Sequence, residues 1–167
     1  MRTPDCRYRN SKEQGVQQEP LVLLVEDDQQ ARDGYAEFLE RGGFRVAQAG
    51  TAEDALLQSL ATVPDVVVTD IALPGRDGFA LATDLQCDTK TRGIPVVAMT
   101  AYWATDVHER ADRAGITAIL LKPCQPEHLI AELQRVLQRT RLPRLAQPGS
   151  ASMTPARSRS AEAKSYF

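Results

Sequence analysis

The sequence has little of what marks a secreted, membrane-spanning or metal-thiolate protein. Its three cysteines, Cys6, Cys87 and Cys124, are odd in number and lack the spacing of a metal site. Such usage is typical of reduced thiols and predicts a cytoplasmic location. No apolar run approaches the ~20 residues that span a bilayer, and the polar N-terminus has no hydrophobic region of a secretory signal. We therefore expect no membrane span.

The body of the chain also lacks an excess of positive charge. Residues 20–138 carry 18 acidic and 10 basic side chains, whereas residues 139–167 carry 6 basic and 1 acidic. Binding to nucleic acid depends on neutralising phosphates, so an acidic body argues against nucleic acid as the partner of the folded part.

Apolar periodicity divides the chain into three segments. We predict a disordered leader over residues 1–19, a folded domain over residues 20–140 and a disordered basic tail over residues 141–167. Both ends have too few apolar residues to form a core. We interpret the tail as a solvated end, and an electrostatic tether to an anionic partner is the alternative.

Short apolar runs alternate with helical patterns along the domain, which is typical of an α/β fold with a parallel sheet. The predicted strands are Leu21–Val25, Phe44–Ala49, a run after Pro64 that ends at Asp70, Ile94–Met99 and Ala118–Leu121. Asp28, Thr51 and Asp77 suit the N-caps of the helices that follow them. Such sheets usually have the strand order 3-2-1-4-5 or 2-1-3-4-5, and the second places strands one and three side by side.

Polar groups stand where the predicted strands end. They are Glu26, Asp27 and Asp28 after the first strand, Asp70 at the third, Thr100 at the fourth and Lys122 after the fifth. Right-handed crossovers place all of these strand ends on one edge of the sheet. In the order 2-1-3-4-5 the groups form one cluster. We interpret Asp28 as a helix cap rather than as part of the cluster.

The acidic groups of this cluster favour a bound cation. Two carboxylates about 4 Å apart repel by about 4 kcal/mol at an effective dielectric constant of about 20. Lys122 alone cannot neutralise three of them, so either a pKa rises or a cation binds. Ligands that are all oxygen predict Mg²⁺, which also prefers phosphate oxygens. His108 and His128 fall on predicted helices away from the strand ends, which disfavours zinc and iron.

A carboxylate beside Mg²⁺ and a lysine has two uses with phosphate. It either holds the metal for phosphoryl transfer elsewhere or is itself the nucleophile and becomes an acyl phosphate. Thr100 could donate a hydrogen bond to a phosphoryl oxygen, and Lys122 could supply a point charge. The chain lacks a GxxxxGK[ST] loop, so we do not expect a nucleotide site.

The segments LLVEDD, TDIALPGRDG, MTA and LLKP, in this order and spacing, resemble the receiver domain of two-component response regulators. The resemblance covers about residues 21–139, nearly all of the predicted body. The fold that we expect is accordingly α/β and flavodoxin-like. It is a doubly wound, five-stranded parallel sheet in the order 2-1-3-4-5, with helices on both faces. The resemblance also implies a cis bond between Lys122 and Pro123.

The resemblance implies a role for each residue of the acidic cluster. Asp70 accepts a phosphoryl group from the phosphohistidine of a histidine kinase or histidine phosphotransfer protein. Glu26 and Asp27 form the acidic pair that binds Mg²⁺ together with Asp70, and of this pair Asp27 is the one expected to ligate the ion directly. Ala72 offers its backbone carbonyl to the metal.

The resemblance also implies how the signal leaves the site. Thr100 and Lys122 bind the phosphoryl group and relay its presence to the face of helix four, strand five and helix five, where a downstream protein binds. Such a protein is a phosphoacceptor rather than an enzyme, and we expect no DNA-binding output domain. Ile119 stands where the family often has an aromatic residue that moves together with the threonine, so we expect the output surface to move differently. Cys124 stands where the family often has Phe and offers a smaller apolar contact. Tyr102 and Trp103 are interpreted as part of an interaction face.

Two other functions fit parts of the pattern. A phosphatase of the haloacid-dehalogenase type carries a second aspartate two residues after its nucleophile, and Ala72 at that position counts against it. A receiver-like binding module that accepts no phosphate is the second alternative, which the unusual Ile119 keeps open.

We predict that the phosphoryl group hydrolyses slowly. In the family, the positions two beyond the phosphorylated aspartate and two beyond the threonine control water access, and here they are Ala72 and Tyr102. Ala72 has no group that positions an attacking water, and Tyr102 is bulky. The measurement is the decay of the phosphorylated protein in Mg²⁺ without a phosphatase, and a lifetime of seconds would contradict the prediction.

Overall fold

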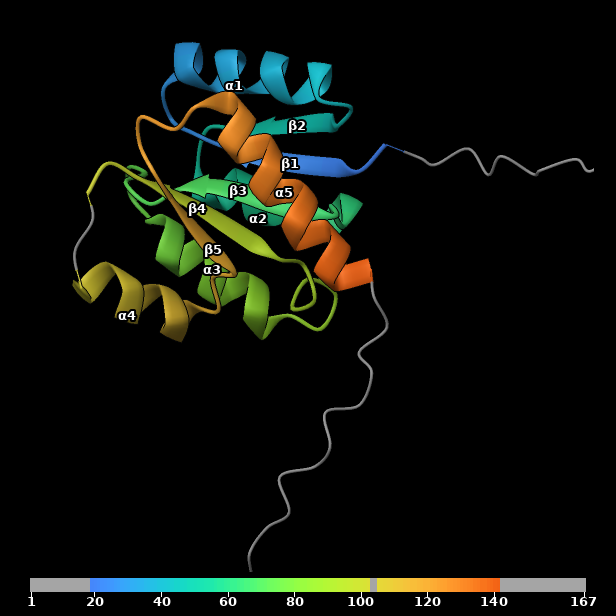
Figure 1. The fold of residues 1–167 in the computed structure, drawn as a ribbon. Helices are drawn as coiled ribbons and strands as arrows, with labels where there is room; N and C mark the ends of the chain where they lie inside the picture. Colours follow the sequence, from blue (N-terminus) through green and yellow to red (C-terminus); the bar gives the residue numbers. More distant parts are fainter. Residues whose placement is uncertain (1–18, 103–104, 142–167) are drawn as a thin grey trace, which may run out of the picture.

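The computed structural model describes residues 19–102 and 105–141. Trp103, the predicted leader before residue 19 and the predicted tail after residue 141 lie outside the described residues. Strands and helices alternate strictly along the described chain (Figure 1). The elements are β1 Leu21–Val25, α1 Gln29–Arg41, β2 Arg45–Ala49, α2 Ala52–Thr62, β3 Val66–Asp70, α3 Gly78–Cys87, β4 Val96–Thr100, α4 Thr105–Ala114, β5 Ala118–Leu121 and α5 Pro126–Arg141.

The strands form one parallel sheet in the order β2-β1-β3-β4-β5, which confirms the predicted flavodoxin-like topology. β3 lies at the centre, and all five of its residues are buried. The continuous run of valines in β3 follows from this position, because a strand covered by helices on both faces has no solvent side. The last residue of β3 is Asp70, so the centre of the sheet delivers a carboxylate to its edge.

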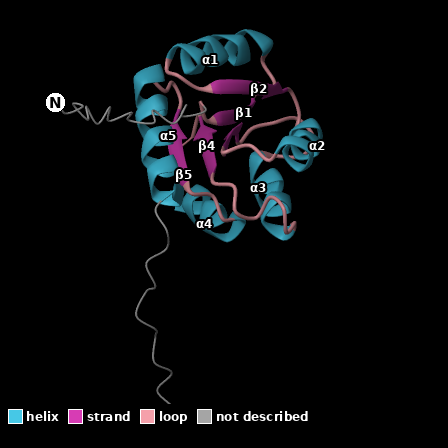
Figure 2. Cartoon of the chain, turned by 90° about the vertical axis from the view of Figure 1, so that its right-hand side faces the viewer, coloured by secondary structure: helices cyan, strands magenta, loops and turns pink. Residues whose placement is uncertain are grey.

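Helices cover both faces of the sheet (Figure 2). Leu23 and Val67 point into a core shared with α2, α3 and α4. The alternate strand residues, such as Leu24 and Val68, point into a second core with α1 and α5. This alternation follows from the two-residue period of a strand. None of these helices, within the described part of the chain, is long and apolar enough to cross a membrane.

Two strands begin later than the sequence predicts. β2 begins at Arg45, because the Phe44 N–H bonds to Leu39 O at 3.2 Å and closes the end of α1. β4 begins at Val96 rather than Ile94, because Pro95 has no N–H for the sheet ladder. Thr100 is then the last residue of β4.

The predicted helix caps are confirmed. Asp28 Oδ1 accepts from the Ala31 N–H at 2.7 Å, and Asp77 Oδ1 accepts from the Ala80 N–H at 2.8 Å. Thr51 Oγ1 accepts from the Asp54 N–H at 3.2 Å. Each cap satisfies a backbone donor that the first helical turn leaves without a partner. The predicted cis bond between Lys122 and Pro123 is also present.

Gly78 packs directly against the backbone of the residue at the end of β3. A Cβ at Gly78 would lie 2.4 Å from Asp70 O and 3.1 Å from Ile71 Cα. The Gly78 N–H donates to Ile71 O at 3.1 Å, so the start of α3 is bonded to the same segment. The close approach therefore needs a residue without a side chain.

We predict opposite effects for alanine at two helical glycines. Gly78→Ala is expected to lower the free energy of unfolding by about 1–3 kcal/mol, because the new methyl group meets backbone atoms that cannot rotate away. Gly34→Ala, in α1, is the control, because a Cβ there meets nothing within 4 Å. It is expected to raise the free energy by about 0.5–1 kcal/mol. Urea unfolding measures both free energies. Equal free energies of unfolding in Gly78→Ala and Gly34→Ala would contradict the close packing of Gly78 against the end of β3.

Candidate functional site

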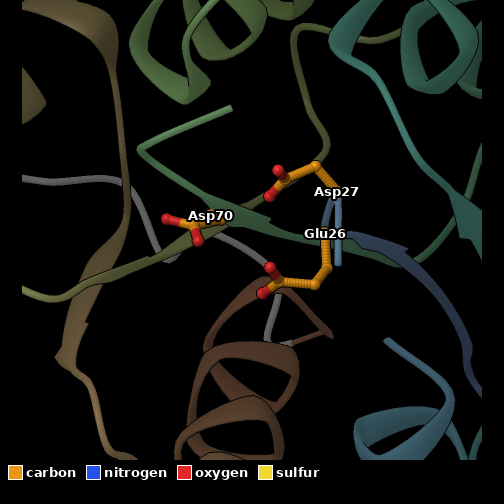
Figure 3. Close-up of side chains that lie close together, drawn as sticks. All are labelled: Glu26, Asp27 and Asp70. Atoms are coloured by element: carbon orange, nitrogen blue, oxygen red, sulfur yellow. The ribbon is translucent and has the colours of Figure 1, made fainter. Parts of the chain in front are cut away.

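Three carboxylates gather at the carboxyl edge of the sheet (Figure 3). β1 pairs with β3 in a register that places Val25 opposite Thr69, so the residues that follow β1 lie beside Asp70. One oxygen from each of Glu26, Asp27 and Asp70 lies within 4.8 Å of the others. Glu26 is 3% exposed and Asp70 is 7% exposed, whereas Asp27 faces solvent. We call these three residues the acidic triad.

Lys122 bridges two members of the acidic triad. Its Nζ donates to Glu26 Oε2 at 2.6 Å and to Asp70 Oδ2 at 2.5 Å. Burial alone would lower the pKa of Lys122, but the hydrogen bonds to Asp70 and Glu26 outweigh burial and raise the pKa. The lysine is therefore charged at neutral pH and is the counter-ion of both buried carboxylates.

The Asp70 carboxylate is held in place by the chain that follows it. Asp70 Oδ1 accepts from the Ala72 N–H at 2.9 Å, and Oδ2 accepts from Lys122. The Asp70 backbone carbonyl accepts from the Thr69 hydroxyl at 2.9 Å. Both carboxylate oxygens thus have a partner that sets the side-chain direction.

Thr100 lies at the same edge, but its hydroxyl bonds elsewhere. Thr100 Oγ1 donates to Tyr102 O at 2.9 Å and accepts from the Tyr102 N–H at 3.1 Å. Lys122 reaches Thr100 only through the backbone, where its N–H donates to Thr100 O at 2.7 Å. The structure therefore joins Asp70, Glu26 and Lys122 by side-chain hydrogen bonds, and Thr100 is bonded instead to the segment after β4.

The two positions that depart from the family pattern lie on opposite faces of the sheet. Ile119 packs against the core that includes α4, and Cys124 packs against the core with α1 and α5. Burial raises the pKa of the Cys124 thiol, which makes it a poor nucleophile at neutral pH. Cys124, like Tyr35, is a partly buried residue that packs against this core.

Two residues of α1, Tyr35 and Arg32, lie near the site and are not among the site residues that the sequence predicts. Burial raises the pKa of Tyr35, the charge of Lys122 opposes that shift, and the charges of Glu26 and Asp70 add to it. Arg32 Nη1 donates to Glu26 O at 2.5 Å. Arginine has a long side chain with five donors, so an arginine in the first turn of a helix can reach back to the carbonyls of the preceding turn, and this is the pattern that could have indicated Arg32.

The donor set fits Mg²⁺. All three side chains offer carboxylate oxygens, and the exposure of Asp27 leaves one side open for water and phosphate oxygens, which this ion prefers to keep. The described residues hold no His or Cys in this group, so a ligand set for zinc is not present here.

A doubly wound parallel sheet with an acidic triad and a lysine at its carboxyl edge defines the receiver type of α/β module. Residues 22–134 match the family described as the response regulator receiver domain. The chain belongs to this family.

Individual relatives are similar over most of the described chain. "Transcriptional regulatory protein PdtaR" of Mycobacterium tuberculosis is 34% identical over 121 residues, which are 72% of this chain and 58% of that protein. "Phosphate regulon transcriptional regulatory protein PhoB" of Escherichia coli is 31% identical over 71% of this chain and 52% of that protein. The chain thus spans little more than half the length of these curated relatives. The structure of chemotaxis protein CheY4 of Vibrio cholerae superposes with a TM-score of 0.69 at 26% identity, covering 71% of this chain and 98% of that one.

We predict that Lys122→Met lowers the free energy of unfolding by about 3 kcal/mol, because it leaves two buried carboxylates without their counter-ion. Mg²⁺ is expected to recover part of this loss, since it binds only the folded state. Denaturant unfolding in EDTA and in Mg²⁺ measures both effects. Lys90→Met is the control, because Lys90 is exposed.

The pH dependence follows from the raised pKa of Lys122. The stabilisation by this group is complete below its unfolded pKa, near 10.5, and declines only as the pH rises through the higher folded pKa. The difference between the wild-type protein and Lys122→Met is therefore expected to stay constant between about pH 7 and pH 9. Equal stability of Lys122→Met and Lys90→Met would contradict the bridging role.

Proposed function

We propose that this protein is a response regulator that accepts a phosphoryl group on Asp70 from a histidine kinase or a histidine phosphotransfer protein. The observation that carries the proposal is the placement of Asp70. Its carboxylate is buried at the end of the central strand, 2.5 Å from Lys122 Nζ and within reach of the two other acidic residues of the triad. A carboxylate that attacks an anionic phosphoryl group needs such a cationic neighbour, because the two negative groups repel each other.

The transfer is a direct displacement at phosphorus. An Asp70 carboxylate oxygen forms the new O–P bond, the P–N bond of the donor phosphohistidine breaks, and its electron pair leaves with the imidazole nitrogen. The Lys122 ammonium group, which is bonded to Asp70, stabilises the negative charge of the phosphoryl oxygens during the transfer. Glu26, Asp27, Asp70 and the backbone carbonyl of Ala72 would hold Mg²⁺, and this ion would supply positive charge to the phosphoryl oxygens.

Thr100 connects the phosphoryl group to the output face. Its hydroxyl has one hydrogen, which now donates to Tyr102 O, so a hydrogen bond to a phosphoryl oxygen requires that this bond be given up. The Tyr102 side chain is 69% exposed, and Leu121, opposite Thr100 in the register of β4 and β5, is 46% exposed. We propose that a downstream protein binds this face of α4, β5 and α5 when Thr100 turns, and that signalling occurs in the cytoplasm.

A binding module that accepts no phosphate is the second candidate. Ile119 favours it, because a branched aliphatic side chain that packs against the core cannot make the aromatic rotation on which many receivers depend. The intact set of Asp70, Lys122 and the acidic pair favours phosphorylation instead. A phosphatase of the haloacid-dehalogenase type remains disfavoured by Ala72.

Acetyl phosphate labelling tests the proposal. Phosphoryl incorporation is expected in the wild-type protein with Mg²⁺, and it is expected to be lost in EDTA and in Asp70→Asn. Asp28→Asn is the matched control, because it removes a carboxylate from the same edge while asparagine still caps α1. Intact-protein mass spectrometry measures the added group. A folded wild-type protein that stays unlabelled would support the binding module, and labelling that survives Asp70→Asn would exclude Asp70 as the acceptor.

A further inference from the structure

The Arg32 side chain folds back over the turn that carries two members of the acidic triad. Arg32 lies in the first turn of α1, where its N–H donates to Asp28 O at 2.9 Å. Its Nη1 donates to Glu26 O at 2.5 Å and to Asp27 O at 3.3 Å. One guanidinium therefore contacts the backbone carbonyls of both residues that precede the helix cap.

The turn is also held from its other side by β2. The Glu26 N–H donates to Ala49 O at 3.2 Å, and a Cβ at Gly50 would lie 3.5 Å from Arg32 Nη1. Both backbone polar groups of Glu26 thus have partners, and the guanidinium fits into a space beside a residue without a side chain. Fixing these peptide planes fixes the directions in which the Glu26 and Asp27 side chains leave the backbone.

We propose that Arg32 is a positioning residue for the metal site, which keeps the Glu26 and Asp27 carboxylates turned toward Asp70. The inference rests on the proposed function, because it takes the acidic triad to be the Mg²⁺ site. The hydrogen bonds of the Arg32 guanidinium go to the backbone of Glu26 and Asp27 and not to their carboxylates. Arg32 acts through two backbone carbonyls, as groups behind a ligand do when they orient that ligand.

The direction in which Mg²⁺ affinity changes when Arg32 is replaced distinguishes a positioning role from the effect of a nearby positive charge. Through space alone, a positive side chain opposes the binding of a cation, so its removal would strengthen Mg²⁺ binding. A positioning role has the opposite sign, because removal frees the turn and the ligands lose their alignment. The affinity for Mg²⁺ therefore has to fall in Arg32→Met, although one positive charge has been taken away.

Calorimetric Mg²⁺ titration of the full chain tests the proposal. Arg32→Met is expected to raise the dissociation constant about tenfold, a usual cost of losing a group that orients a metal ligand. Arg32→Lys keeps the positive charge but lacks the planar set of guanidinium donors. Its dissociation constant for Mg²⁺ is expected to lie between those of the wild-type protein and Arg32→Met. Arg41→Met is the matched control. Arg41 lies on the same helix and pairs with Glu37 one turn away, so its loss is expected to change the dissociation constant less than about twofold.

Each other outcome overturns the proposal. Tighter or unchanged Mg²⁺ binding in Arg32→Met, or a loss no larger than that of Arg41→Met, excludes the positioning role while the metal site stands. A wild-type protein that binds no Mg²⁺ removes the metal site of the proposed function as well. Thermal unfolding in EDTA shows whether each variant folds. If Arg32→Met does not fold, Arg32→Lys tests the proposal instead. A dissociation constant for Mg²⁺ in Arg32→Lys that equals that of the wild-type protein overturns the positioning role.

Discussion

The repulsion among three carboxylates at one edge of the sheet is the constraint on which the site depends. Glu26 and Asp70 are almost completely buried, and their negative charges are tolerated because Lys122 donates a hydrogen bond to each. The lysine comes from the end of β5 and reaches across β4 to β3, so the bridge ties three parts of the sheet together. A site with one cation for three anions remains attractive to a second cation, which is the property that a Mg²⁺-dependent receiver needs.

The order of the strands makes this crowding possible. β1 and β3 are neighbours only because the chain crosses back over β1 after β2, and the parallel register then brings the residues after Val25 beside Asp70. Two residues hold the backbone around the carboxylates. Gly78, the last residue of the TDIALPGRDG segment, lets α3 begin against Asp70 O, and Arg32, which lies outside the recognisable segments, donates to the carbonyls of the β1–α1 turn. Such supports matter because a ligand that is misplaced by a fraction of an ångström loses much of its effect.

Two residues near the proposed output face, Ile119 and Thr100, differ in how they relate to the family pattern. Ile119 occupies the place of the usual aromatic side chain, is partly buried and packs against the core that includes α4. Thr100, in contrast, is joined by two hydrogen bonds to Tyr102, so any movement of its hydroxyl acts first on the backbone that leads to α4. The exposed residue Tyr102 stands two positions after Thr100, between β4 and α4, whereas position 119 of β5 holds no aromatic residue. If the proposed function holds, a partner that recognises the phosphorylated state is expected to contact Tyr102.

The fold class, the helix caps and the set of polar residues at one edge could be predicted from the sequence alone, and the strand order through the family resemblance. These features depend on local patterns: apolar runs bounded by turns, short polar caps, and ordered motifs at strand ends. The tertiary structure decided what those patterns do not contain. It placed the Thr100 hydroxyl on Tyr102, brought Arg32 onto the turn before its own helix, and made Gly78 a contact of Asp70 O. Hydrogen-bond partners and close approaches of this kind depend on distances between segments, and a one-dimensional pattern carries residue types without those distances.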